Sequence, residues 1–145
     1  MILPDVNVLI YAFRQDAKSH HIARAVLDPL FTGDTRFGIS PLTLGTLVRV
    51  TTNARTFANA SSLEEAFGFC DDVYSHSNCQ IVTPGERHWR IFERLCLQTN
   101  TRGTDVADAW YAALAIEWGC EWITFDRDYA RFPGLNYKLL VAPSG

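Results

Sequence analysis

The sequence lacks any long run of apolar residues. Nowhere among its 145 residues does an uncharged apolar stretch approach the roughly 20 residues that a membrane-spanning helix needs. The first residues are apolar, but they carry no basic leader and no small-residue cleavage site, and Asp5 and Asn7 interrupt them. A secretory signal peptide would have those features, so we expect none. We therefore expect a soluble, cytoplasmic protein with no membrane partner.

Cysteine is scarce and shows no metal-binding pattern. The four cysteines form no CxxC pair and have no metal-knuckle spacing. A chain of this length can build a core without disulfide bonds to support it. We expect buried, reduced thiols at Cys70, Cys79, Cys96 and Cys120, as in a cytosolic protein.

The motifs of several enzyme classes are also absent. There is no HExxH metal motif, no Ser-His-Asp pattern and no signature of a cysteine nucleophile. The segment GDTRFG at 33–38 lacks both the GxGxxG spacing and the lysine of a phosphate-binding loop. Nothing in the sequence therefore supports hydrolysis through a covalent intermediate or a glycine-rich phosphate site.

A large excess of positive charge is missing as well. The formal net charge of −3 argues weakly against nucleic-acid binding, because phosphate binding usually leaves a basic footprint. Cations nevertheless recur along the chain, while many acids are grouped at Glu64-Glu65 and Asp71-Asp72. The distribution of charge therefore leaves room for local positive surface.

What the sequence does contain predicts one folded domain over 1–145. The composition, 48% hydrophobic and 20% charged, is typical of globular proteins and far from that of disordered chains. A chain of 145 residues can bury about two-thirds of its unfolded surface in a single core. No internal repeat, low-complexity tract or long linker divides it.

Short aliphatic runs alternate with segments of helical periodicity. This alternation predicts an α/β fold of three layers, with a mainly parallel central sheet covered by helices on both faces. Strands are expected at 2–5, 36–40, 79–84, 120–126 and 137–141, and helices at 6–13, 20–31, 41–53, 62–75, 86–99 and 104–119.

Acidic residues follow the strands at one edge of this predicted sheet. Asp5 ends the first strand, Asp126 ends the strand CEWITFD, and Asp108 lies near the start of a helix that is apolar on most sides. Helix or turn capping is one explanation for each acid: Asp5 for the first helix, Asp105 with Asp108 for the helix after 104, and Asp126 with Asp128 for the turn DRDYARF.

Capping does not explain why several acids gather at one edge. Each pair of like charges about 4 Å apart costs roughly 4 kcal/mol at an effective dielectric constant near 20. A divalent cation would offset that repulsion, and Mg²⁺ or Mn²⁺ prefers oxygen ligands in an open, partly hydrated site. Such a site can activate water and stabilise a phosphoryl group, so the acids predict phosphodiester hydrolysis.

Three motifs, in this order, resemble a known family. LPDVNVLIYAF at the start, DVADAWYAALAIEWG late in the chain and WITFDRDYARFPGL near the end resemble the PIN-domain ribonucleases, in particular the VapC-type toxins of bacterial toxin–antitoxin pairs. The resemblance spans nearly the entire chain. Its specificity comes from the order and separation of the motifs, because any one of them alone is a weak signal.

The resemblance implies a function and a set of site residues. Asp5, Asp108 and Asp126 would bind Mg²⁺ or Mn²⁺, Asp128 would be a further acid of the catalytic group, and Asn7 and Thr124 would support them. Members of the family are metal-dependent endoribonucleases, usually homodimers, that cut structured RNA such as tRNA or rRNA. A small VapB-like antitoxin, typically encoded beside the toxin, blocks them.

One position departs from the family pattern. The helix after the second strand commonly carries a glutamate, in a pattern like T-L-x-E-x-x-R, but this chain reads TLGTLVR with Thr46 at that place. Thr46 would then hold a metal-bound water, or Asp105, one helical turn before Asp108, would supply the charge. A third alternative is a site that binds metal poorly.

Two other functions therefore remain open. The first is a non-catalytic PIN-like module that binds RNA or protein through a degraded site. The second is a phosphatase with Asp5 as nucleophile, as in haloacid-dehalogenase-like folds; it is weakened because Asn7 replaces the second acid of the D-x-D motif and no lysine site is evident.

Several conspicuous residues receive a structural interpretation. The cluster around His20 and His21 is expected at a solvated helix start, and Arg49 either binds a phosphate or forms an ion pair. The tryptophans are expected in the core or at a dimer interface rather than stacked on bases. They are Trp89, Trp110, Trp118 and Trp122.

Overall fold

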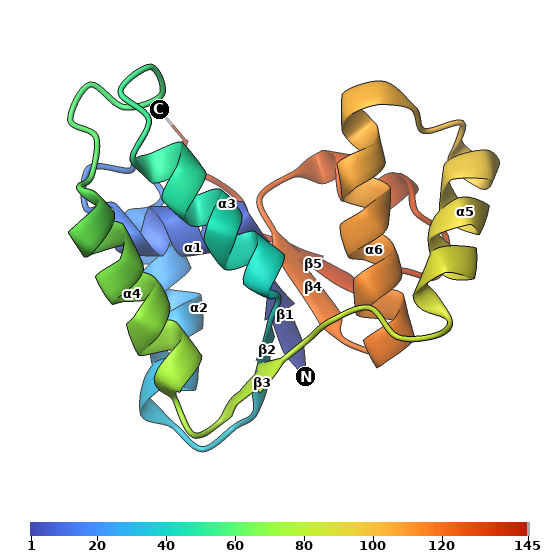
Figure 1. The fold of residues 1–145 in the computed structure, drawn as a ribbon, viewed down its shortest axis with the longest axis horizontal. Helices are drawn as coiled ribbons and strands as arrows, with labels where there is room; N and C mark the ends of the chain where they lie inside the picture. Colours follow the sequence, from blue (N-terminus) through green and yellow to red (C-terminus); the bar gives the residue numbers. More distant parts are fainter. Residues whose placement is uncertain (145) are drawn as a thin grey trace.

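A computed structural model describes residues 1–144 of the chain, and strands alternate with helices along it (Figure 1). The strands are β1 (Ile2–Pro4), β2 (Phe37–Ile39), β3 (Cys79–Ile81), β4 (Glu121–Thr124) and β5 (Tyr137–Leu139). The helices are α1 (Val6–Phe13), α2 (His20–Thr32), α3 (Pro41–Thr51), α4 (Leu63–Ser75), α5 (His88–Thr99) and α6 (Val106–Trp118), with 3-10 turns η1 (Gly103–Asp105) and η2 (Arg127–Arg131).

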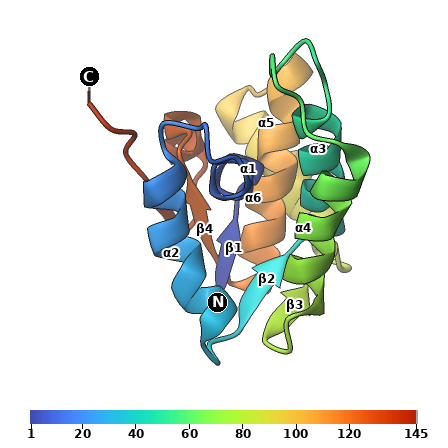
Figure 2. The same ribbon diagram turned by 90° about the vertical axis from the view of Figure 1, so that its left-hand side faces the viewer.

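The five strands form one sheet in the order β3-β2-β1-β4-β5. All four strand pairings are parallel, which confirms the predicted sheet. β1 and β4 are neighbours although more than a hundred residues separate them, and Pro4 pairs with Ile123. β1 leads directly into α1, and β4 runs in the same direction beside it (Figure 2). The carboxyl ends of β1 and β4 therefore meet at one edge.

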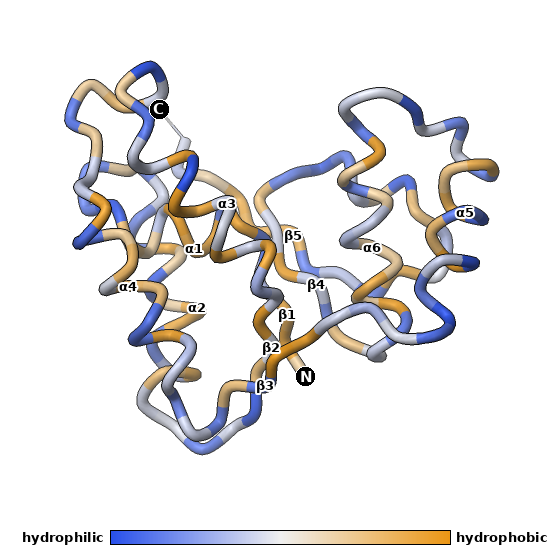
Figure 3. Tube along the Cα trace, viewed as in Figure 1, coloured by the Kyte–Doolittle hydropathy of each residue, from blue (hydrophilic) through white to orange (hydrophobic). Residues whose placement is uncertain are grey.

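The helices cover the two faces of the sheet, as predicted. α1 to α4 lie on one side of the strands, and α5 and α6 lie on the other (Figure 1). Alternation along the strands supplies both cores: Leu3 and Trp122 pack with α5 and α6, whereas their neighbours Ile2 and Ile123 pack with α1 to α4. Hydrophobic residues are concentrated along β1 and β2, and much of the hydrophilic colour lies in the outer loops (Figure 3).

Local sequence explains where the helices begin and end. Ser62 and Glu65 form a capping box at the start of α4, with each side chain accepting a hydrogen bond from the other residue's backbone N–H. Pro41 occupies the first turn of α3, where its missing N–H costs nothing. Gly119 ends α6 with a φ of 66°, which glycine adopts without strain.

The element boundaries differ from the predicted ones mainly at strand ends. β3 stops at Ile81 rather than at 84, and β4 stops at Thr124 rather than at 126. The predicted strand at 2–5 ends at Pro4, because Asp5 already caps α1. No helix within residues 1–144 has both the length and the apolar character to cross a bilayer.

The close packing between neighbouring strands of the sheet can be tested at Gly38. A Cβ at this position would stand 2.8 Å from Val82 Cγ2 and 3.4 Å from Leu3 Cδ1. We expect Gly38→Ala to lower the free energy of unfolding by about 1–3 kcal/mol, because both neighbours are buried and have little room to move.

Gly68→Ala in α4 is the matched control. Nothing lies within 4 Å of a Cβ at Gly68, so the alanine should stabilise the helix by up to about 1 kcal/mol. Urea unfolding of both variants checks the pair. Equal stability of Gly38→Ala and the parent protein would contradict the described packing.

Candidate active site

Asp5 stands at the junction of β1, β4 and α1. Its backbone N–H donates to the carbonyl of Ile123 at 2.8 Å, which continues the strand pairing by one residue. Its Oδ1 accepts from the N–H of Val6 at 2.6 Å, and its Oδ2 accepts from the Thr124 hydroxyl at 2.7 Å. The capping interpretation of Asp5 is therefore confirmed, and the same carboxylate also binds the neighbouring strand.

The loop after β4 is attached to this junction by polar side chains. The Thr124 hydroxyl accepts from the N–H of Asp126 at 2.9 Å. The Asn7 side-chain oxygen accepts from the N–H of Phe125 at 3.4 Å. Thr124 and Asn7 thus hold Asp126 next to the strand that carries Asp5.

Asp126 and Asp128 occupy the start of the η2 turn. Asp126 Oδ1 accepts from the N–H of Asp128 at 2.9 Å, which confirms the predicted turn cap. Asp126 is half-buried, whereas Asp128 is exposed. The structure therefore places Asp128 beside Asp126 in the chain but on the outer side of the turn.

Asp108 lies in the first turn of α6, where two residues of the η2 turn reach it. The Tyr129 hydroxyl donates to Asp108 Oδ1 at 3.3 Å, and Arg131 Nη2 lies 3.4 Å from Asp108 Oδ2. Sequence reasoning missed Tyr129 and Arg131. The signal that was present is the spacing in DRDYARF, where Arg131 follows Asp128 by three residues and donates to its carbonyl at 2.7 Å.

Electrostatic interactions with neighbouring acids affect the carboxylates of Asp5 and Asp108. Burial raises the pKa of Asp5 to about 6, against the hydrogen bonds from Thr124 and Val6, and the charges of Asp108 and Asp126 raise it further. Asp5 is only 6% exposed. Burial also raises the pKa of Asp108, a shift that Arg131 opposes and Asp126 reinforces. Asp108 and Asp126 therefore lie close enough to Asp5 for their charges to act on its carboxylate.

The expectation for Asp105 is wrong in part. Asp105 immediately precedes α6, but its side chain makes no capping hydrogen bond, so the expected capping pair with Asp108 does not form. Its side chain is exposed. The charges that raise the pKa values of Asp5 and Asp108 come from other acids. The cause is the 3-10 turn η1, which places Asp105 in helical backbone geometry with φ −75° and ψ −10° rather than in the extended geometry of a side-chain cap.

Sequence reasoning missed Tyr111 on α6, whose hydroxyl interacts with Thr43 and Thr46 on α3. The Thr46 hydroxyl donates to the carbonyl of Leu42 at 2.9 Å. Burial raises the pKa of Tyr111, the hydroxyls of Thr43 and Thr46 lower it, and the charge of Asp5 raises it again. Tyr111 follows Asp108 by three residues on α6, a spacing that places both on one helix face.

The donor set suits a hard divalent cation. Carboxylate oxygens are the ligands that Mg²⁺ and Mn²⁺ prefer, and the buried Asp5 carboxylate has hydroxyl and amide partners but no cation. Within residues 1–144, no three acid, histidine or cysteine side chains already stand together at metal-ligand spacing. Mg²⁺ keeps several waters and needs only one or two direct carboxylates, so this open arrangement fits such an ion.

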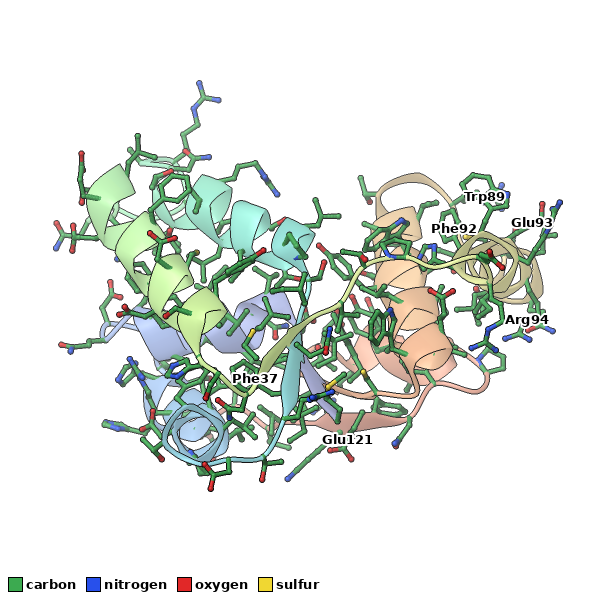
Figure 4. The ribbon with its side chains drawn as sticks, turned by 60° about the horizontal axis from the view of Figure 1, so that its bottom comes forward. Phe37, Trp89, Phe92, Glu93, Arg94 and Glu121 are labelled. Carbon is green, nitrogen blue, oxygen red and sulfur yellow. The ribbon has the colours of Figure 1, made fainter. Side chains whose placement is uncertain are left out.

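The other conspicuous residues are mostly structural. His20 Nδ1 lies 2.8 Å from the carbonyl of Tyr11, which ties α2 to α1. Trp122 is fully buried and confirms the core interpretation, but Trp89 is 63% exposed on the outer side of α5 (Figure 4), so it is not a core residue. All four cysteines are free thiols; Cys70 and Cys120 are buried, and Cys79 and Cys96 are half-buried.

Comparison with known proteins agrees with this geometry. The PIN domain family model matches residues 2–135. The VapC ribonuclease Mb2897 of Mycobacterium bovis is 36% identical over 138 residues, which cover 95% of this chain and 94% of that protein. Ribonuclease VapC25 of Mycobacterium tuberculosis is 34% identical over 137 residues, covering 94% and 96% of the two chains.

Solved structures share the fold. VapBC2 from Rickettsia felis, bound to a DNA fragment of its promoter, superposes with a TM-score of 0.66 at 17% identity and covers 96% of this chain and 98% of that one. The sarcin-ricin loop cleaving toxin VapC20 of Mycobacterium tuberculosis superposes with a TM-score of 0.65 at 16% identity, covering 94% and 99%.

The fold, the acids at the sheet edge and the family match together define the class: the chain belongs to the PIN-domain family. Within that family, its sequence groups it with the VapC ribonucleases.

The raised pKa of Asp5 predicts an unusual pH dependence of stability. The folded metal-free protein binds the Asp5 proton more tightly than the unfolded chain, so this group stabilises the fold below pH 4 and loses that contribution as the pH rises through about 6. A shift from 3.8 to about 6 corresponds to about 3 kcal/mol.

Asp5→Asn tests this, because asparagine keeps the helix cap without the charge. In EDTA we expect the variant to be less stable than the parent below pH 4 and relatively more stable at neutral pH, by urea unfolding. Parallel pH profiles for the two proteins would show that the Asp5 carboxylate is not destabilised by burial.

Proposed function

We propose that this protein is a VapC-type, Mg²⁺- or Mn²⁺-dependent endoribonuclease that hydrolyses RNA phosphodiester bonds, with tRNA or rRNA as substrate. What supports the proposal is that Asp5 lies at the carboxyl edge of a parallel sheet, where burial and the charges of Asp108 and Asp126 raise its pKa. Ligand sites of open α/β sheets lie at that edge. The similarity to VapC ribonucleases supports the same function.

In this proposal each acid has a defined role. Asp5, Asp108 and Asp126 would hold the metal, and Asp128 would contribute charge from the exposed side of the η2 turn. When bound, the metal supplies positive charge for the phosphoryl group and lowers the pKa of a water molecule. Thr124 fixes the orientation of Asp5, and Tyr129 and Arg131 fix the orientation of Asp108.

The phosphatase alternative has less support, because the second acid of its D-x-D motif is absent. Asn7 stands at that place, and its side-chain oxygen accepts a hydrogen bond from the Phe125 N–H. The non-catalytic alternative is a distinct outcome of the experiment, because the family pattern that this chain resembles has a glutamate at the position of Thr46.

Cleavage of a labelled RNA pool by the purified protein tests the proposed activity. We expect cutting with Mn²⁺ or Mg²⁺, none with EDTA, and a loss of at least about a hundredfold in Asp5→Asn, Asp108→Asn or Asp126→Asn, because each removes a ligand charge that stabilises the transition state. Asp128→Asn should lose less, because its side chain is exposed.

Asp34→Asn, an exposed acid in the loop after α2, is the matched control and should cut like the parent. Retention of metal-dependent cutting in all three acid variants would point to a contaminating nuclease. Metal-stimulated RNA binding with no cutting by the parent protein would favour the non-catalytic module.

We also propose a VapB-like antitoxin partner, a homodimer and a cytoplasmic location. The VapBC structures from Rickettsia felis, Salmonella typhimurium and Haemophilus influenzae support the partner, since each shares this fold. The surface of α4 offers an apolar row to a partner: Leu63, Phe67 and Tyr74 share one helix face, and each is more than half exposed.

Replacing Phe67 should separate antitoxin binding from nuclease activity. We expect Phe67→Ser to weaken binding of the proposed VapB-like antitoxin by about tenfold or more, through lost apolar contact, and to leave RNA cleavage unchanged. Leu97→Ser is the control, because Leu97 is also an exposed apolar residue but lies on α5. Calorimetric titration measures the affinity of each variant for the antitoxin. Equal affinities for the two variants would show that α4 is not part of the interface.

A further inference from the structure

Arg131 brings a positive charge to one of the three acids of the proposed metal site. It ends the η2 turn, and its Nη2 lies 3.4 Å from Oδ2 of Asp108 in the first turn of α6. The side chains of Arg131 and Asp108 are 28% and 25% exposed. Of the salt bridges formed within residues 1–144, only this one involves Asp5, Asp108 or Asp126.

The guanidinium of Arg131 is held by contacts that do not depend on Asp108. Its Nη1 donates to the carbonyl of Asp128 at 2.7 Å, and its Cζ lies 4.4 Å from the centre of the Phe132 ring. Phe132 is buried and packs against the buried ring of Tyr129, with centroids 5.9 Å apart. The carbonyl and the ring therefore keep the positive charge beside Asp108 even when that carboxylate acquires another partner.

Asp108 itself has only long contacts with protein donors. The Tyr129 hydroxyl donates to its Oδ1 at 3.3 Å, and Arg131 reaches its Oδ2 at 3.4 Å. Charge-assisted hydrogen bonds between an arginine and a carboxylate are usually about 2.7–2.9 Å long. The carboxylate therefore keeps lone pairs that a metal ion can take, while Arg131 acts on it mainly as a nearby charge.

A divalent cation bound to Asp108 would lie close to this fixed positive charge. Like charges a few ångströms apart repel strongly at a partly buried site, and salt screens only part of that repulsion. The ion would either displace the guanidinium from Asp108 or share the carboxylate with it. In both cases it binds less tightly than it would beside a neutral side chain.

We propose that Arg131 is an internal cation that balances the charge of Asp108 in the metal-free protein and lowers the affinity of the site for Mg²⁺ or Mn²⁺. The inference rests on the proposed metal-dependent function and adds to it a positioning residue that controls metal loading. Arg131 keeps Asp108 oriented while the site is empty. It also raises the ion concentration at which the site fills.

Calorimetric titration of Mn²⁺ into the purified protein, with no RNA present, tests the proposal. We expect Arg131→Gln to bind Mn²⁺ about tenfold more tightly than the parent protein at low ionic strength, and the difference to shrink as salt is added. Arg131→Lys keeps the charge but loses the planar fork, so its affinity should stay within about threefold of the parent value. Arg24→Gln is the matched control, because it removes an arginine that pairs with Asp28 on α2, and it should bind Mn²⁺ like the parent.

Urea unfolding gives a second readout that does not depend on catalysis. In EDTA, Arg131→Gln should lower the unfolding midpoint of the parent protein more than that of Asp108→Asn, because only the parent is left with a half-buried carboxylate that lacks its cation. At one fixed concentration of Mn²⁺, the midpoint of Arg131→Gln should rise by more than that of the parent, because the variant binds the ion more tightly.

Unchanged or weaker Mn²⁺ binding by Arg131→Gln would overturn the proposal. An equal gain in affinity in Arg131→Gln and Arg131→Lys would overturn it too, because the charge would then not be the cause. No Mn²⁺ binding by either the parent or Arg131→Gln would overturn both this proposal and the metal site. Tighter binding by Arg131→Gln, with no RNA cleavage by the parent, would overturn the nuclease alone and leave the role of Arg131 standing.

Discussion

The pairing of β1 with β4 is the constraint on which the rest of the site depends. These strands come from opposite ends of the sequence, and the register that sets Pro4 against Ile123 brings Asp5 beside Thr124. The Thr124 hydroxyl then binds the Asp5 carboxylate on one side and orients the Asp126 backbone on the other. A shift of one residue in this register would turn these side chains to the opposite face of the sheet.

The cost of this arrangement is a carboxylate buried without a cation. Hydrogen bonds from Val6 and Thr124 offset only part of the lost hydration, so the Asp5 pKa stays near 6. The negative charge of Asp108 is compensated in a different way, because Arg131 of the η2 turn forms a salt bridge with it. A fold that retains an uncompensated acid at a ligand-binding edge is typical of a functional site rather than of structural capping.

Most of the fold could be predicted from the sequence, and part of the site could not. Short aliphatic runs ending at Asp5 and Asp126 predicted parallel strands with acids at one edge, because that signal is local. The contacts of Tyr129 and Arg131 with Asp108, and of Tyr111 with α3, join segments distant in sequence and carry no periodic signal. The prediction that Asp105 caps α6 was wrong, because backbone geometry as well as residue type decides whether an acid caps a helix.

Diffraction from a crystal of the protein soaked in Mn²⁺, recorded at the manganese absorption edge, tests the central claim most directly. The account predicts an anomalous peak bounded by the carboxylates of Asp5, Asp108 and Asp126 in the parent protein, and its loss in Asp5→Asn. A peak at another acid group, or no peak at saturating Mn²⁺ while the three carboxylates remain paired only with protein donors, would contradict it.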